Sequence, residues 1–165
     1  MNEHKLNPVV TAVLPSGIRR FFDIASTIKD VISLGIGEPD FITPYHIRDA
    51  VINSLLDGET QYTGNYGLLE LREEIAYYMQ ERFHVTYAPD SEILVTVGAS
   101  EAIDIVMRGL LAPGDEVLVP DPGYVSYAPC VQFAGGKPVP VVTSAADAFQ
   151  LTAEALEKAI TNKTK

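Results

Sequence analysis

The chain has one cysteine, three histidines and no tryptophan among its 165 residues. A single cysteine, Cys130, excludes an internal disulfide framework and a thiolate metal cluster. The histidines, at positions 4, 46 and 84, are too scattered in the sequence to suggest a metal site or a catalytic triad. Cys130 stands in an apolar helical stretch, so we expect it to be a small buried core residue.

Basic residues are also few. Twelve lysines and arginines stand against 22 aspartates and glutamates, which gives a formal charge of −10. Nucleic acid is therefore not an expected partner, since phosphate backbones bind clusters of lysine and arginine and none is present. The polar residues 1–5 lead into no apolar run of signal-peptide or membrane-span length. We expect a cytoplasmic protein that does not bind a membrane.

Hydrophobic residues make up 47% of the chain, and its length is sufficient for one domain with a core built around one sheet. Its C-terminal two fifths alternate between short apolar runs and amphipathic segments. The expected strands are 92–97, 115–120 and 138–142, and the expected helices are 99–111, 124–133 and 151–160. Continuous apolar runs are typical of strands that are buried on both faces. The pattern predicts an α/β fold with a mostly parallel sheet sandwiched by helices.

The N-terminal part is irregular by comparison. It predicts a short helix or arm within 1–15, and then further elements, which are a helix at 19–29, a short strand at 31–34 and helices at 45–57 and 68–83. In the last of these helices Leu71 and Ile75 belong to an apolar stripe, while Arg72 is expected to face away from it. We divide the chain into an N-terminal arm with the irregular segment that follows it, 1–44, and a larger domain, 45–165.

Residues 92–111 are typical of a buried strand that turns directly into a helix. The start of a helix leaves backbone N–H groups unpaired and carries partial positive charge, so it favours an anion such as phosphate. Gly98 gives the turn room, and Ala99 and Ser100 open the helix. The alternative is that Ser100 is an ordinary N-cap. Glu101 would repel a phosphate if it pointed inward, so we expect it to point outward.

Short motifs surround this strand-turn-helix joint in a fixed order. They are Gly35-Ile36-Gly37-Glu38-Pro39-Asp40-Phe41, Tyr62-Thr63, Gly67-Leu68-Leu69-Glu70-Leu71-Arg72, Pro113-Gly114-Asp115, Asp121-Pro122-Gly123-Tyr124 and Ala134-Gly135-Gly136. From about residue 16 to residue 165, the set resembles the N-terminal part of class I/II aminotransferases, which are pyridoxal phosphate (PLP) enzymes of fold type I. The resemblance implies that 45–165 is an incomplete PLP-binding large domain, and that 1–44 belongs to the small domain.

The resemblance also implies cofactor-binding residues. Gly98, Ala99 and Ser100 would hold the PLP phosphate through backbone N–H groups and the serine hydroxyl. Tyr124 would stack on the pyridine ring, although a tyrosine packed in the core is the alternative. Tyr62 would reach across the interface of a homodimer to the partner's cofactor phosphate, with an exposed loop tyrosine as the alternative.

Two further residues are matched to the substrate by the same resemblance. The backbone at Gly37 would approach the substrate carboxylate, where a side chain would obstruct it; the alternative is a plain turn glycine. Ile18 would be an apolar contact of the segment that folds over the substrate. No metal ligand is expected.

The family's catalytic lysine lies in a serine-rich setting, and none of the six lysines here has such surroundings. We therefore expect a PLP-dependent aminotransferase, acting on an amino acid and a 2-oxo acid, of which this chain is an N-terminal part without a catalytic residue or activity of its own. A PLP lyase or synthase of the same fold, or a PLP-sensing domain of a regulator, are the alternatives. The motifs look closest to bacterial members acting on aromatic amino acids or diaminopimelate derivatives.

Overall fold

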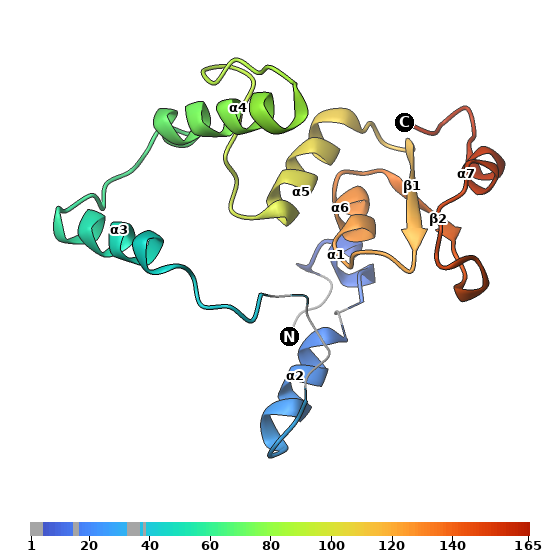
Figure 1. The fold of residues 1–165 in the computed structure, drawn as a ribbon. Coiled ribbons are helices and arrows are strands. Elements are labelled where there is room, and N and C mark those ends of the chain that lie inside the picture. The colour runs from blue at the N-terminus through green and yellow to red at the C-terminus, as the bar shows by residue number, and fades with distance from the viewer. Residues whose placement is uncertain (1–4, 15–16, 33–36, 38) are drawn as a thin grey trace. The chain divides into compact units, whose positions relative to one another are not determined.

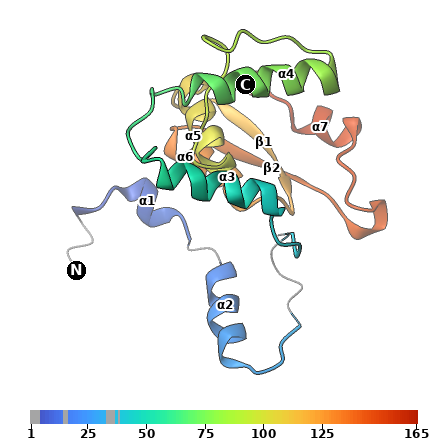
Figure 2. The same cartoon turned by 60° about the vertical axis from the view of Figure 1, so that its left-hand side comes forward.

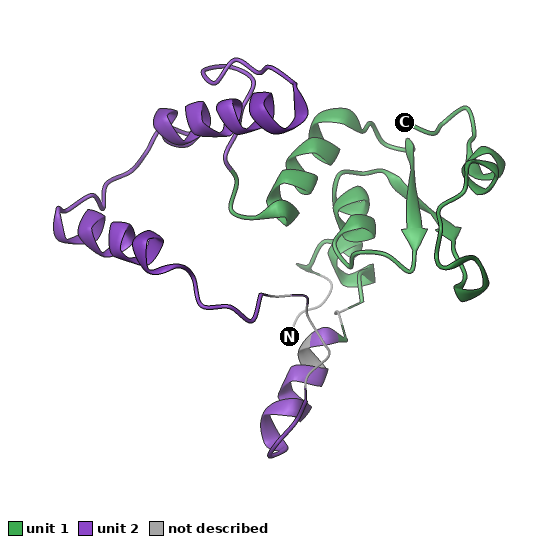
Figure 3. Ribbon diagram, viewed as in Figure 1, with its two compact units in different colours: residues 1–17, 96–165 green, residues 18–95 purple. Residues whose placement is uncertain are grey.

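The computed structural model describes residues 5–14, 17–32, 37 and 39–165. The chain divides into two compact units, which Figure 3 shows in different colours. Unit 1 combines residues 1–17 with 96–165, and unit 2 comprises residues 18–95. The expected boundary at residue 44 was drawn from the domains of a longer protein and not from compactness within this chain. It stays a prediction.

Unit 1 is built on two parallel strands, β1 (Glu116–Asp121) and β2 (Lys137–Val142). Glu116 pairs with Lys137 at one end and Asp121 with Val142 at the other. Both strands and their parallel direction agree with the prediction from the sequence. The chain near its C-terminus adds to the other edge of β1, because Thr164 forms an isolated parallel bridge with Glu116.

Helices lie on both sides of this small sheet. Unit 1 contains α1 (Pro8–Ala12), α5 (Ala99–Leu110), α6 (Tyr127–Phe133) and α7 (Ala153–Ala159), with a 3-10 turn at Ala145–Asp147. α6 packs against both strands, α5 and α1 pack against α6, and α7 packs against β2. Figures 1 and 2 place α6 and α7 on opposite sides of the strands, as expected for a sheet sandwiched by helices.

The apolar core of unit 1 is small. Within the described ranges, the buried apolar residues are Cys130 and Val131 of α6 and Val141 of β2. The expectation for Cys130 is confirmed. In the described part of unit 2, α2, α3 and α4 do not pack closely on one another, and most of their large apolar residues are exposed. The expectation of one domain with one core stays a prediction.

One expected strand is missing. Residues 92–97 belong to no strand in the described structure. The N–H of Val95 donates to the carbonyl oxygen of Tyr66 at 3.1 Å. A strand exists only beside a partner with free backbone groups. In the described part of the chain, β1 and β2 pair with each other and leave no strand for 92–97.

The helix expected at 124–133 begins later, at Tyr127. The chain folds back sharply at Gly123, where an added Cβ would lie 2.3 Å from the carbonyl oxygen of Pro120. Residues 122–126 form this turn, and α6 begins only after them. Tyr124 therefore lies in a loop.

The described residues of unit 2 form the helices α2 (Ile18–Thr27), α3 (Tyr45–Leu56) and α4 (Leu69–Phe83). All three match expected helices within two residues. The strand expected at 31–34 falls partly outside the described residues, and Val31 and Ile32 are not in a strand. Among the described residues, no helix is long and apolar enough to cross a membrane.

The expected facing of α4 was wrong at Leu71 and Arg72, whereas Ile75 of the expected stripe is half-buried. Leu71 is 45% exposed and the helix buries Arg72 instead, at 9%. Apolar periodicity predicts a buried stripe only where another element covers it. Arg72 is buried by the loops at both ends of its own helix, which the periodicity does not reveal.

Candidate functional site

The start of α5 presents unpaired backbone donors. Its N-cap is Gly98, with φ 85° and ψ 167°, a conformation that side chains rarely adopt. The following N–H groups, those of Ala99 and Ser100, donate to no acceptor in the described part of the chain. They lie at the positive end of a helix of 12 residues. The geometry expected from the sequence, a glycine turn followed directly by a helix, is therefore present.

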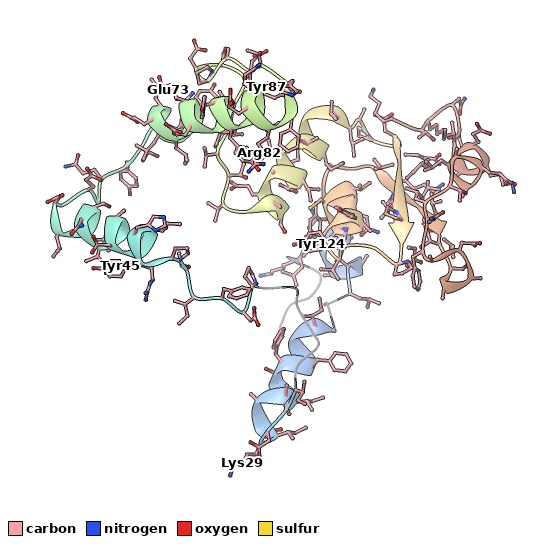
Figure 4. All side chains as sticks on the ribbon, viewed as in Figure 1. Lys29, Tyr45, Glu73, Arg82, Tyr87 and Tyr124 are labelled. Carbon is pink, nitrogen blue, oxygen red and sulfur yellow. The ribbon has the colours of Figure 1, made fainter. Side chains whose placement is uncertain are left out.

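A cluster of three hydroxyl groups adjoins this helix start. Ser100 Oγ lies 2.8 Å from the hydroxyl oxygen of Tyr124 and 3.2 Å from Ser126 Oγ. Tyr124, labelled in Figure 4, comes from the loop after β1, and Ser126 is the N-cap residue of α6. The Sγ of Cys130 lies 3.9 Å from the carbonyl oxygen of Ser100, within the distance of a weak hydrogen bond to sulfur. Residues from α5, the β1–α6 loop and α6 thus meet at one point.

Both the hydroxyl group and the ring of Tyr124 make contacts with neighbouring side chains. Hydrogen bonding with Ser100, and then with Ser126, lowers the pKa of the Tyr124 hydroxyl below its ordinary value. Its ring meets the ring of Tyr127 edge to face, with centroids 5.5 Å apart. The side chain is still 49% exposed, so part of the ring is free for a ligand.

Tyr124 also lines a shallow cavity of about 380 Å³ beyond the carboxyl end of β1. The second half of β1, the loop at 123–125, Ala128 of α6 and two prolines of β2 form its wall. In open α/β sheets, ligands gather at this end of the strands. Among the described residues, Gly98, Ala99 and Ser100 are not part of this wall, so the cavity and the helix start are neighbours joined through Tyr124.

Glu101, which was expected to point outward, makes a hydrogen bond to the backbone before the helix. Its side chain is exposed, but the carboxylate turns back and accepts a hydrogen bond from the N–H of Val97. It therefore satisfies a donor just before the helix, much as the glutamate of a capping box does. The N–H groups of Ala99 and Ser100 stay free of it.

The other expected residues lie in unit 2. Tyr62 is fully exposed in the loop between α3 and α4, and Ile18 is the first residue of α2, 41% exposed. A Cβ at Gly37 would have nothing within 4 Å, so no described atom crowds this position. The structure thus brings together Ser100 and Tyr124, and it does not test the roles expected of Tyr62, Ile18 and Gly37.

Ser126 was missed by the sequence analysis. Its position two residues after Tyr124, at the end of an apolar strand, and the preference of serine for helix N-caps are the signals that would have found it. Its hydroxyl accepts no cap hydrogen bond from the N–H groups of its own helix and lies beside Ser100 Oγ instead.

The donors at this point suit an anionic oxygen. They are backbone amides and hydroxyl groups, and the described hydrogen bonds of the cluster include no carboxylate, since that of Glu101 binds the N–H of Val97. They also include no lysine or arginine, so the helix dipole and hydrogen bonds supply the attraction. A phosphate group fits this donor set.

Comparison with known proteins decides the family. The sequence profile described as aminotransferase class I and II matches residues 29–165. The chain belongs to the class I and II aminotransferases. The recognition of this family from ordered motifs is confirmed, and so is the fold type I architecture, since solved aminotransferases share its fold.

Individual relatives agree. The chain is 52% identical over 160 residues to the putative aminotransferase YugH of Bacillus subtilis (strain 168), covering 97% of this chain and 42% of that protein. It is 44% identical over 163 residues to a probable N-acetyl-LL-diaminopimelate aminotransferase of the same organism, covering 99% and 41%. The crystal structure of Thermus thermophilus aspartate aminotransferase with maleate superposes with a TM-score of 0.86 at 36% identity, covering 97% and 43%. The chain spans about 40% of the length of these relatives.

Proposed function

We propose that this chain is the N-terminal part of an aminotransferase that transfers an amino group between an amino acid and a 2-oxo acid with PLP as cofactor. The observation that carries the proposal is the meeting of the α5 start with the hydroxyl groups of Ser100 and Tyr124, 2.8 Å apart. The proposal includes a cytoplasmic homodimer, in which Tyr62 reaches the partner subunit's cofactor phosphate.

Each residue of the cluster has a separate task in this proposal. The N–H groups of Ala99 and Ser100, with the Ser100 hydroxyl, bind the phosphate, and Gly98 permits the turn that exposes them. The Tyr124 ring stacks on the cofactor ring, which contributes about 0.5–1.5 kcal/mol beyond burial. Bound PLP supplies an electron sink for negative charge that develops on the substrate α-carbon.

The lysine that holds the cofactor is expected outside these 165 residues. Three lysines of unit 1 are already paired, since Lys137 contacts Glu116 at 2.9 Å, and Lys158 and Lys165 contact acidic side chains. None of them lies in a serine-rich setting. We therefore expect the chain alone to be inactive.

The proposal is tested with a longer protein. Residues 1–165 are joined to the part of YugH that follows its matched segment, and the product is assayed for PLP absorbance and for amino transfer from amino acids to 2-oxo acids. We expect a PLP absorbance band and transfer from the joined protein, and neither from the chain alone. Elimination of the substrate without transfer would indicate a PLP lyase instead.

Site variants then test the residues themselves. Ser100→Ala and Tyr124→Ala should each weaken PLP binding, measured by absorbance titration, because they remove a phosphate donor and the stacking ring. Tyr77→Ala is the control, since Tyr77 is an exposed tyrosine of α4. Unchanged PLP affinity in both site variants would refute the assignment of this cluster.

A further inference from the structure

Arg72 is a buried cation that has no acidic partner among the described residues. It lies in the first turns of α4 and is 9% exposed. Its Nε donates to the carbonyl oxygen of Gly67 at 3.3 Å, and its Nη1 donates to the carbonyl oxygen of Pro89. The guanidinium also lies over the ring of Tyr66, 5.9 Å from the centroid. Within the described ranges, no carboxylate forms an ion pair with it.

Such an arrangement requires a specific backbone position. A buried charge is costly unless its donors are satisfied, and here neutral carbonyl groups and an aromatic face satisfy them. Arg108, by contrast, forms an exposed ion pair with Asp104 on the same helix, which contributes little. Arg72 therefore joins two backbone segments, the loop before α4 and the segment after it.

The same two segments meet again at Val95. The N–H of Val95 donates to the carbonyl of Tyr66 at 3.1 Å. Gly67 has φ 92°, and a Cβ there would lie 2.7 Å from the Cβ of Val95, so only glycine fits. The contacts of Arg72 and of Val95 thus fix residues 66–67 against residues 89–95.

Each fixed segment leads to a residue with a proposed role in binding cofactor, in this subunit's site or in the partner subunit's site. Residue 95 is followed directly by 96–98, which end in the glycine turn before α5, and the loop that ends at Gly67 carries Tyr62. We propose that Arg72 is a positioning residue that holds the Tyr62 loop and the chain entering the phosphate-binding turn in one fixed relation. This role rests on the proposed function.

The fixation itself is tested on the 165-residue chain by amide hydrogen exchange, without any cofactor. In Arg72→Lys, the ammonium group cannot bond both carbonyls, so we expect exchange at the amides of Gly67 and Val95 to rise by about tenfold. Exchange at Ile75 and Met79 within α4 should stay unchanged. The control is Arg82→Lys, at an exposed arginine of the same helix (Figure 4). It should leave amide exchange unchanged at Gly67 and Val95, and also at Ile75 and Met79.

Arg72→Met should raise exchange further at the same two amides. If Arg72→Met unfolds unit 2, the exchange measured in Arg72→Lys decides whether Arg72 fixes the two segments. Unchanged exchange at Gly67 and Val95 in Arg72→Lys would overturn the proposal, and so would an equal rise at Ile75 and Met79, which would indicate general destabilisation.

The link to the cofactor is tested in the longer joined protein by PLP titration of Arg72→Lys, Tyr62→Phe and the double variant. Each single variant should weaken PLP binding several-fold, and the double variant should be weakened by less than the product of the two, because both act through the same loop. Independent effects would overturn the positioning role. Failure of the unsubstituted joined protein to bind PLP would refute the proposed function, while the exchange experiment would still decide whether Arg72 fixes the two segments.

Discussion

The hydroxyl oxygens of Ser100 and Tyr124 lie 2.8 Å apart, although 24 positions separate the two residues in the sequence. Ser126 lies 3.2 Å from the same Ser100 oxygen, so the serine hydroxyl is shared between two neighbours. The contact depends on the loop after β1, which returns the chain to the start of α5.

This contact predicts the titration of Tyr124. Hydrogen bonding with Ser100 is the largest cause that lowers the pKa of Tyr124, and Ser126 is the second. Ser100→Ala should therefore raise this pKa toward the ordinary tyrosine value, and Ser126→Ala should raise it less. The measurement is the ultraviolet absorbance of tyrosinate against pH, with the matching Tyr124→Phe variant subtracted to remove the other tyrosines. Identical titration of Tyr124 with and without the Ser100 hydroxyl would contradict the contact.

Glu116 predicts how unit 1 responds to acid. Its carboxylate accepts from Thr161 Oγ1 at 2.6 Å and from Lys137 Nζ at 2.9 Å, and these two bonds lower the pKa of Glu116. A lowered pKa in the folded state gives stability that is present above the unfolded-state pKa, about 4.3, and is lost as the pH falls through the folded value.

The urea midpoint should accordingly fall on acidification from neutral pH, and Glu116→Gln should show a smaller fall. Glu157→Gln, at an exposed position of α7, serves as the control and should keep the full acid dependence. An acid response of Glu116→Gln equal to that of the unsubstituted chain would show that Glu116 does not carry the effect.

The small core predicts that replacing two valines of unit 1 with alanine lowers the free energy of unfolding by unequal amounts. Val131 of α6 is 1% exposed, whereas Val142 at the end of β2 is 72% exposed. Val131→Ala should lower the free energy of unfolding by about 1–3 kcal/mol, because it removes buried methyl groups and leaves a cavity. Val142→Ala should change it by less than about 0.5 kcal/mol. Denaturant unfolding of both variants measures the difference, and equal costs would mean that α6 is not packed as described.

Local patterns were sufficient to predict the helices and β1 with β2. The apolar spacing in α5, the prolines that end segments and the glycine before Ala99 all act within a few residues, so the sequence displays them directly. The resemblance assigned Tyr124 and Ser100 to the same cofactor, and each follows an apolar run that was interpreted as a parallel strand. That expectation of proximity held, although one of the two runs, 92–97, forms no strand.

Contacts between distant backbone groups were not predictable in this way. Residues 92–97 have the composition of a strand, but pairing needs a neighbour that composition does not supply. Arg72 has the composition of a surface residue, and its burial depends on the carbonyl groups of Gly67 and Pro89, which only the folded loops bring together. Ser126 was missed for the same reason, since its partner Ser100 lies 26 positions away.

The prolines of β2 predict how unit 1 avoids association through its sheet edge. The N–H groups of Lys137 and Thr143 donate toward β1, to Asp115 and Asp121, both at 2.8 Å. By alternation, positions 138 and 140 would direct N–H groups to the outer edge of β2, and both are prolines, which have none.

Replacing both prolines with threonine restores two outward donors on an edge that pairs with no other strand in the described part of the chain. Sedimentation should then show self-association that rises with concentration, whereas Pro113→Thr, at an exposed turn outside the sheet, should leave the association state unchanged. Blocking donors at one edge is a device that proteins use against edge-to-edge pairing, so an unchanged sedimentation profile in the double variant would mean that another surface already covers this edge.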